Sequence, residues 1–209
     1  MLALTLSLGV WQIERLHWKE ALLSDIDRAE AAPAIPMPAN PTPFEKIEIS
    51  GTLRGDLMAH YGSEVRGVVG GAKIGAQLIV PLDRPGQPPV LVDLGWLPDD
   101  STLRLPVGPT TITGYIRPAE PAGRLSPGPD LTERRFWSLD PAPIGRSLGL
   151  TDVAPYTVVA LGPIAAIPSP AQSLPRPSND HLGYAATWFG LALCLVGIFV
   201  VFARRTLRQ

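Results

Sequence analysis

One apolar run dominates the hydrophobic pattern of the chain, close to its C-terminus. Residues 182–203 are 22 positions without a formal charge, and at about 1.5 Å per residue they form a helix about 33 Å long. That length crosses the hydrocarbon core of a bilayer, and a helix buried in a soluble domain rarely needs apolar residues on every face. The pattern therefore predicts a transmembrane helix over residues 181–203.

The charges that flank this run predict its orientation. Arg204, Arg205 and Arg208 follow it directly, whereas Arg176 is the only cation in the fifteen residues before His181. Because positive residues favour the cytoplasmic side of a membrane, we expect the tail 204–209 in the cytoplasm and His181 on the outer side.

A second helix is predicted over residues 1–31, where the chain contains no proline. Its first thirteen residues are uncharged and reach only about 20 Å, less than the roughly 30 Å of hydrocarbon. No basic segment precedes this run, and no A-x-A-like cleavage site follows it before the amphipathic part, so a signal peptide is not favoured. We expect a transmembrane helix whose upstream turns are missing.

Between the two helices, short strand-like runs are separated by Gly, Pro or Asp. The runs begin at residues 46, 75, 88, 110, 135 and 155, and a helical segment is expected over 141–150. No βαβ repeat is present, which favours a small antiparallel sheet or barrel. The predicted fold class is a membrane protein in which two transmembrane α-helices, the N-terminal one truncated, flank a mainly antiparallel-β extramembrane domain with one short helix. That domain is expected over 45–165, between proline-rich linkers at 32–44 and 166–180.

Composition and charge exclude several classes of function. The net charge is −1, so the chain has no basic footprint for nucleic acid. Its one cysteine, Cys194, lies in the apolar run and can form neither an intramolecular disulfide nor a thiolate cluster for zinc or copper. The glycine-rich segment 67–76 lacks the ending of a P-loop and is expected to form a loop or hairpin.

Catalytic chemistry is not indicated either. The chain has three histidines, and only His60 lies in the predicted outer domain, where its surroundings predict a hairpin with Gly62 and Ser63 in the turn. No serine has a credible base beside it. We therefore expect a protein that is not an enzyme, and a membrane-tethered hydrolase is disfavoured.

Two stripes of residues on the predicted helices are candidates for a binding site. On the C-terminal helix, helical spacing puts Tyr184, Ala185, Trp188 and Ala192 on the face of His181, which suits either an aromatic belt at the interface or a ligand site. On the first helix, the stripe contains Trp11, Arg15, Trp18 and Leu22. It suits either an interfacial anchor or a contact face for the second helix or for a ligand.

Three motifs resemble the surfeit locus protein 1 family, the Shy-type assembly factors of haem-copper cytochrome c oxidase. They are "LGVWQIERLHWKEALL" near the start, "VLVDLGWLP" at 90–98 and "PSNDHLGYAATWFGLAL" near the end. They occur in the family's order, and the resemblance extends from about residue 8 to 203. It implies two helices around an outer domain.

The resemblance also implies roles for individual residues. Haem a binding would fall to His181 as the ligand of the haem iron, with Tyr184, Thr187 and Trp188 matching the rest of that motif. The first motif is matched by Trp11, Gln12, Arg15, Trp18 and Lys19. Trp188 is positioned to stack on the macrocycle, and Arg15 or Lys19 to meet its propionates.

A G-W-x-P element is matched by Gly95, Trp96 and Pro98. Leu94 stands where the family usually has arginine, so a cationic role at this turn is not expected.

The function implied is help in inserting or retaining haem a in the catalytic subunit of the oxidase. Its partners would be that subunit, the haem a synthase and membrane lipid. The alternative is a scaffold that docks the catalytic subunit or the synthase without binding haem. The expected location is the bacterial inner membrane, with a periplasmic domain and a cytoplasmic C-terminus, or the mitochondrial inner membrane in a eukaryote.

Overall fold

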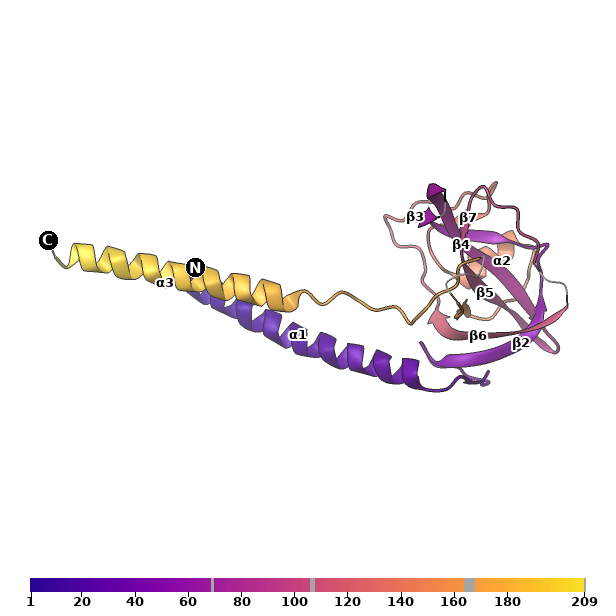
Figure 1. Cartoon of the computed structure of the whole chain (residues 1–209), viewed down its shortest axis with the longest axis horizontal. Coiled ribbons are helices and arrows are strands. Elements are labelled where there is room, and N and C mark those ends of the chain that lie inside the picture. Colours follow the sequence, from indigo (N-terminus) through magenta and orange to yellow (C-terminus); the bar gives the residue numbers. More distant parts are fainter. Residues whose placement is uncertain (69, 106–107, 164–167, 209) are drawn as a thin grey trace. The chain divides into compact units, whose positions relative to one another are not determined.

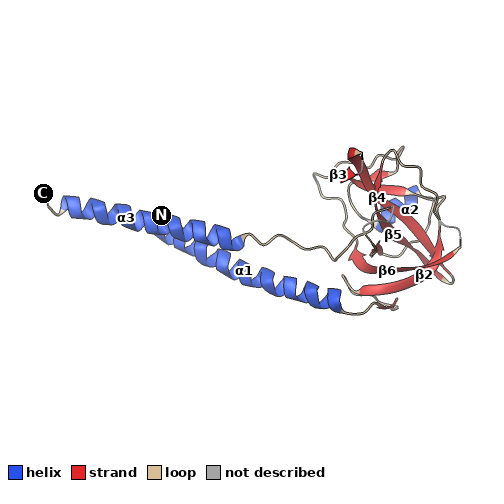
Figure 2. Ribbon diagram, viewed as in Figure 1, coloured by secondary structure: helices blue, strands red, loops and turns tan. Residues whose placement is uncertain are grey.

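The computed structural model describes residues 1–208 apart from 69, 106–107 and 164–167. The chain divides into two compact units, one made of Met1–Arg28 with Pro175–Gln209 and the other of Ala29–Leu174. Figures 1 and 2 show a pair of long helices in the first unit and a β-rich domain in the second. Residues 166–167 of the predicted second linker and residue 209 of the predicted tail lie outside the described residues.

The helical unit consists of α1 (Leu2–Ala31) and α3 (His181–Thr206). The two helices lie side by side, and a Cβ atom built on Gly9 of α1 would come within 2.7 Å of the Phe189 ring of α3. The buried residues of both helices are small or polar: Thr5, Gly9 and Gln12 in α1, and Ala185 and Ala192 in α3. Small side chains let two helix backbones approach closely, which is typical of helix pairs in membranes.

Within the described part of the chain, α3 is the one helix long and apolar enough to cross a membrane. The first helix does not meet these criteria, since charged residues begin at Glu14. The structure therefore supports a candidate membrane helix at the C-terminus and a long N-terminal helix.

The domain is built on one sheet of eight strands in the order β1-β2-β6-β8-β5-β4-β3-β7. The strands are β1 (Ile35–Pro36), β2 (Lys46–Leu53), β3 (Ala59–Val68), β4 (Gly71–Arg84), β5 (Gln87–Pro98), β6 (Pro109–Pro118), β7 (Arg135–Phe136) and β8 (Tyr156–Ala160). Strand β2 pairs with β6 along its length and with β4 at its end, so five strands close into a small barrel. Most pairs are antiparallel, while β5–β8, β1–β2 and β3–β7 are parallel.

The structure corrects one local prediction. Gly62 and Ser63 do not form a hairpin turn: they lie within β3, where the register with β4 shifts between Tyr61 and Glu64. A bulge explains this local irregularity, because Gly62 adopts a φ of 71° inside the strand. The predicted linker at 32–44 contains β1, which pairs with the edge of β2.

Two faces of the sheet bury separate clusters. Inside the barrel, each of the five strands contributes apolar residues such as Ile47, Val92 and Val158. Outside it, Ile79 and Leu91 pack against Ile144 of α2 (Pro141–Ser147), whose first turn is capped by the Asp140 side chain. Each fully buried side chain of this size contributes about 1.5–3 kcal/mol to folding.

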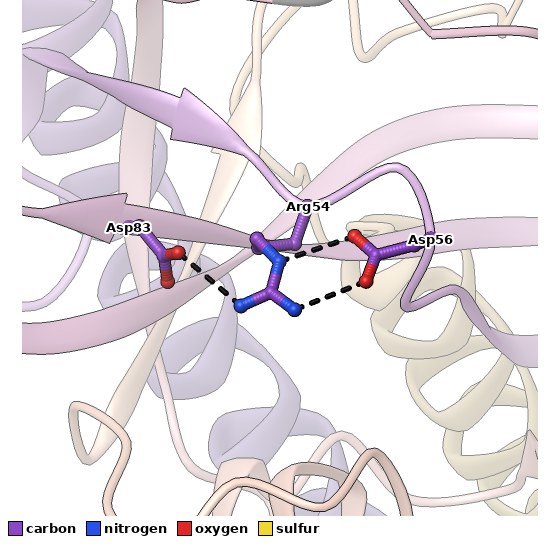
Figure 3. Close-up of polar contacts among 3 residues, drawn as sticks. All are labelled: Arg54, Asp56 and Asp83. Carbon is purple, nitrogen blue, oxygen red and sulfur yellow. Dashed lines mark hydrogen bonds and ion pairs between the residues drawn. The ribbon is translucent and has the colours of Figure 1, made fainter.

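An exposed ion-pair cluster marks the point where the barrel closes. Arg54, just after β2, donates hydrogen bonds to Asp56 at 3.1 and 3.0 Å and to Asp83 of β4 at 3.4 Å (Figure 3). The hydrogen bond from Arg54 lowers the pKa of the Asp56 carboxyl below its ordinary value. Solvent screens these charges, so the apolar interior, and not this cluster, holds the strands together.

Candidate functional site

The helical unit places His181 against a polar residue of the other helix. The Nδ1 atom of His181 lies 2.7 Å from the Oε1 atom of Gln12, a side chain that is 8 % exposed. These residues are 169 positions apart in the chain, and they meet because α1 and α3 pack through their small residues.

This contact determines which ring nitrogen carries the proton. An amide oxygen can only accept a hydrogen bond, so Nδ1–H of His181 donates to Oε1 of Gln12. The neutral imidazole then has its lone pair on Nε2, and no hydrogen bond to Nε2 is present within the described part of the chain. Histidines that bind metals usually donate their other N–H in this way, which fixes the orientation of the ring.

The surroundings of His181 suit an apolar ligand with a polar edge. Trp188, two turns further along α3, is half-buried on the face that also buries Ala185 and Ala192. Two residues before His181, the Oδ1 atom of Asn179 is buried without a hydrogen-bond partner among the described residues. The start of α3 thus combines an available imidazole nitrogen with an uncommitted amide acceptor, and an indole ring lies two turns further along the same helix.

Three predicted site residues lie away from this contact face. Trp11 is 52 % exposed and Tyr184 58 %. Arg15 is exposed, with its guanidinium group 4.0 Å from the centre of the Trp18 ring. No hydrogen bond, ion pair or ring contact between described residues joins any of the three to His181.

Helix geometry explains these positions. At about 100° per residue, Tyr184 lies about 60° away from His181 around α3, whereas Trp188 lies about 20° away. On α1, the stripe of Trp11, Arg15 and Trp18 turns away from the face of Gly9 and Gln12 that meets α3. The described contact with α3 thus lies on another face of α1, and both roles of the stripe, as an interfacial anchor or as a contact face for the second helix or a ligand, stay predictions.

Sequence reasoning matched Gln12 to a motif but did not assign it a partner. A signal was present, since Gln12 is a polar side chain in a run that is otherwise uncharged and largely apolar up to Ile13. A buried polar group in such a position needs a hydrogen-bond partner.

The G-W-x-P element forms a bulge in β5. Asp93 and Trp96 pair with Ile79 and Gln77, so β5 has one more residue here than β4. Gly95 has a φ of 111°, and a Cβ atom on it would lie 2.1 Å from the carbonyl oxygen of Ser169. The backbone therefore requires glycine at this position.

The bulge also holds a buried carboxyl group that sequence reasoning did not single out. Asp93 is 3 % exposed, and its Oδ1 accepts a hydrogen bond of 2.9 Å from the Gly95 N–H. Burial raises the pKa of Asp93 to about 6, although the Gly95 hydrogen bond and the charges of Arg117 and Arg66 oppose this shift.

Metal-binding side chains and His60 were the remaining candidates for chemistry. No group of three or more metal-binding side chains is found among the described residues. His60 is half-buried, and its Nδ1 lies 3.5 Å from the Glu133 carbonyl oxygen, at the limit of a hydrogen bond. The fold and the site together define a β-barrel domain attached to a helix pair that includes a candidate membrane helix.

Comparison with known proteins then gives the family. The SURF1 family matches residues 1–193, so the chain belongs to the SURF1 family. A SURF1-like protein of Rickettsia felis is 27% identical over 214 residues, covering 97% of this chain and 93% of that protein. Surfeit locus protein 1 of Takifugu rubripes is 23% identical over 227 residues, covering 97% and 92%. The mouse protein of the same name is 24% identical over 231 residues, covering 98% and 74%. The predicted family is confirmed.

Proposed function

We propose that this chain is a non-enzymatic assembly factor for haem-copper cytochrome c oxidase. It binds haem a at His181 and helps to insert or retain it in the catalytic subunit. The observation that carries this proposal is the His181–Gln12 hydrogen bond, which leaves Nε2 of His181 as a lone-pair donor at the start of the candidate membrane helix. Membership of the SURF1 family and the motif around His181 support it.

In this proposal the residues of the helix pair have separate roles. His181 would hold the haem iron through Nε2, Gln12 would hold the imidazole ring and its tautomer, and Trp188 would offer an indole face to the haem. Trp11, Arg15 and Tyr184 are exposed, so they would contact the cargo only where it extends beyond the helix contact. When bound, haem would supply an iron that takes an imidazole nitrogen as a ligand.

The proposed setting is a membrane. With α3 crossing it and Arg204 and Arg205 at the cytoplasmic end, His181 and the barrel domain lie on the periplasmic side of a bacterial inner membrane. The partners would be the oxidase catalytic subunit, the haem a synthase and lipid. The equivalent site in a eukaryote would be the mitochondrial inner membrane.

The second candidate is a scaffold that docks the catalytic subunit or the synthase without binding haem. The same contact supports this alternative, because a partly buried histidine–glutamine hydrogen bond also fixes the register of two helices. In that case the imidazole would serve helix pairing alone.

Visible spectra of the purified protein separate the two candidates. From cells that make haem a, we expect a Soret band in the native chain that is largely lost in His181→Ala and kept in the control His60→Ala. Gln12→Glu, which can only accept from Nδ1–H, should keep the band, whereas Gln12→Leu should lower haem occupancy about tenfold. A Soret band that persists unchanged in His181→Ala would rule out ligation and leave the scaffold.

A further inference from the structure

A small polar cavity lies in the barrel domain, on the outer face of the sheet. It measures about 180 Å³, and six of its lining residues are Tyr61, Arg66, Gln77, Asp93, Tyr115 and Arg117. Val90 and Val92 of β5 face the barrel interior, so Leu91 and Asp93 alternate to the outside.

Strand pairing assembles this cavity from distant parts of the chain. Asp93 of β5 lies opposite Val159 of β8, which in turn lies opposite Tyr115 of β6. The segment around Ser169 closes one side, because its backbone exchanges two hydrogen bonds of 2.8 Å with Trp96. None of the helical unit is needed to form it.

The cavity contains a buried polar group with unused bonding capacity. The Gly95 N–H is the one hydrogen-bond donor to the Asp93 carboxyl group among the described residues, and it reaches Oδ1. Oδ2 is left without a partner in a side chain that is 3 % exposed. Solvent reaches Oδ2 from the cavity, because this atom is not among the buried atoms that lack a partner, so a ligand that replaces the solvent can hydrogen-bond to it.

Cationic groups outnumber anionic ones in the lining. Arg66 lies 5.3 Å from the Trp96 ring centre, and Arg117 lies 5.4 Å from that of Tyr61. Each guanidinium is held in place by one glutamate, Glu64 or Glu120, at 2.8–2.9 Å. Stacking and ion pairing hold each group by one edge and leave other N–H groups for a ligand.

We propose that this cavity binds a carboxylate group. Its oxygens accept hydrogen bonds from Arg66, Arg117 and the Tyr115 hydroxyl, and the neutral carboxylic form of Asp93 donates to one of them. The charge of the ligand is limited to −1, because a dianion such as phosphate would place its second charge beside Asp93.

The buried carboxyl group of Asp93 favours a carboxylate ligand over a cationic one. Desolvation raises the pKa of Asp93 to about 6, so its neutral form is populated in mildly acidic solution. Burial and the Asp93 charge also raise the pKa of Tyr115 to about 12, so its hydroxyl stays a donor. An amine ligand would instead face two guanidinium groups.

The size of the cavity limits the ligand to about six non-hydrogen atoms, since a cavity of about 150 Å³ holds benzene. The carboxylate comes either from a free short-chain acid or from an arm of a larger molecule whose body stays outside. This proposal does not rest on haem ligation by His181.

The test uses the full chain in a non-ionic detergent and ¹⁹F NMR of 3-fluoropropionate, which has six non-hydrogen atoms. We expect saturable broadening of the fluorine signal that propionate reverses and that propionamide and propylamine do not. The proposal is overturned if propionamide or propylamine reverses the broadening at the same concentration. It is also overturned if no broadening is seen up to about 100 mM, because the binding free energy would then be weaker than about 1.4 kcal/mol.

Charge-removing variants locate the site. Arg66→Gln should weaken binding about tenfold, the loss expected for one charge-assisted hydrogen bond. The matched control is Lys73→Gln, which removes a cation that pairs with Asp100 on the surface outside the cavity. Asp93→Asn should bind at least as tightly as the native chain at pH 8. An equal loss in Lys73→Gln, or a loss of binding in Asp93→Asn, contradicts the proposal.

A second comparison separates the two sources of the carboxylate. If an arm of a larger molecule is the ligand, metal-free mesoporphyrin IX, which has two propionate arms, should displace 3-fluoropropionate. Its dimethyl ester should not. Displacement by propionate but by neither porphyrin assigns a free short-chain acid. Equal displacement by the porphyrin and its ester shows non-specific adsorption and overturns the proposal for an arm.

Discussion

The helix pair and the barrel domain bury their interiors in different ways. In the helix pair, the buried residues are Thr5, Gly9, Gln12, Ala185 and Ala192. In the barrel, they are mostly large aliphatic side chains from the five strands. Burying large apolar residues stabilises a domain in water, but it gives little advantage to a helix surrounded by lipid. There, close packing and hydrogen bonds determine how strongly two helices associate.

Each unit also buries one polar group that matters for its chemistry. In the helix pair, Gln12 and His181 satisfy each other across the contact. In the barrel, Asp93 is satisfied on one oxygen only. Two polar side chains that hydrogen-bond to each other fix each other's direction. A polar group with an unused hydrogen-bonding atom can instead bind a ligand through that atom.

The largest stability effect is expected in the barrel, from Gly95→Ala. A Cβ atom there would lie 2.1 Å from the Ser169 carbonyl oxygen, on a backbone with a φ of 111°. We expect a loss of about 3 kcal/mol or more in the free energy of unfolding, because both a steric clash and a strained backbone oppose the variant. Urea denaturation followed by tryptophan fluorescence measures it. Gly67→Ala is the control, since no atom lies within 4 Å of a Cβ there, and equal losses would contradict this account.

Asp93→Asn should cause the next largest change in the free energy of unfolding, and the size of this change depends on pH. The folded pKa of about 6 lies above the ordinary 3.8, so the folded state favours the protonated acid. The stability that this group contributes is complete below about pH 4 and is lost as the pH rises through 6. The neutral amide avoids that loss, so the variant should be more stable by up to about 3 kcal/mol at pH 8 and equal to the native chain near pH 4. A constant difference across this pH range would exclude the mechanism.

A smaller effect is expected in the helix pair from Gly9→Ala. The added Cβ atom meets only the outer atoms of the Phe189 ring, at 2.7–3.0 Å, and this ring can shift, so we expect a loss of about 1 kcal/mol. Phe189→Ala removes the colliding atoms and should largely cancel that loss. A double-mutant cycle in which helix content is followed through an SDS titration measures the coupling. Additive losses would show that Gly9 and Phe189 do not pack together.

The smallest effect is expected from Arg54→Gln. It breaks the ion pairs with Asp56 and Asp83 shown in Figure 3, all of which are exposed. Because solvent screens such pairs, the urea midpoint should not change measurably. A clear shift would mean that barrel closure depends on this cluster more than on the apolar core.

Much of the fold followed from local patterns. The strand predicted from residue 46 is β2, and the helical segment at 141–150 contains α2. The turn predicted at Gly62 failed, because a glycine with positive φ suits a bulge as well as a turn, and pairing with β4 selects the bulge. Strand β1 was missed because two residues have no periodicity of their own.

The candidate site was only partly predictable. His181 and Trp188 could be placed on one face of a helix by spacing, because helix periodicity is local. Which face of α1 meets that helix depends on the small residues at Thr5 and Gly9, whereas the sequence pattern left the Trp11 stripe open as an anchor or a contact face.

The sequence by itself determined the family, the apolar C-terminal helix and the barrel-forming strands, because these depend on motifs and on periodicities within short segments. Only the tertiary structure decided that Gln12 accepts from His181 and that Asp93 lies in a cavity with Arg66 and Arg117. Those contacts join residues far apart in the chain, so they arise from helix packing and strand register, which no local pattern encodes.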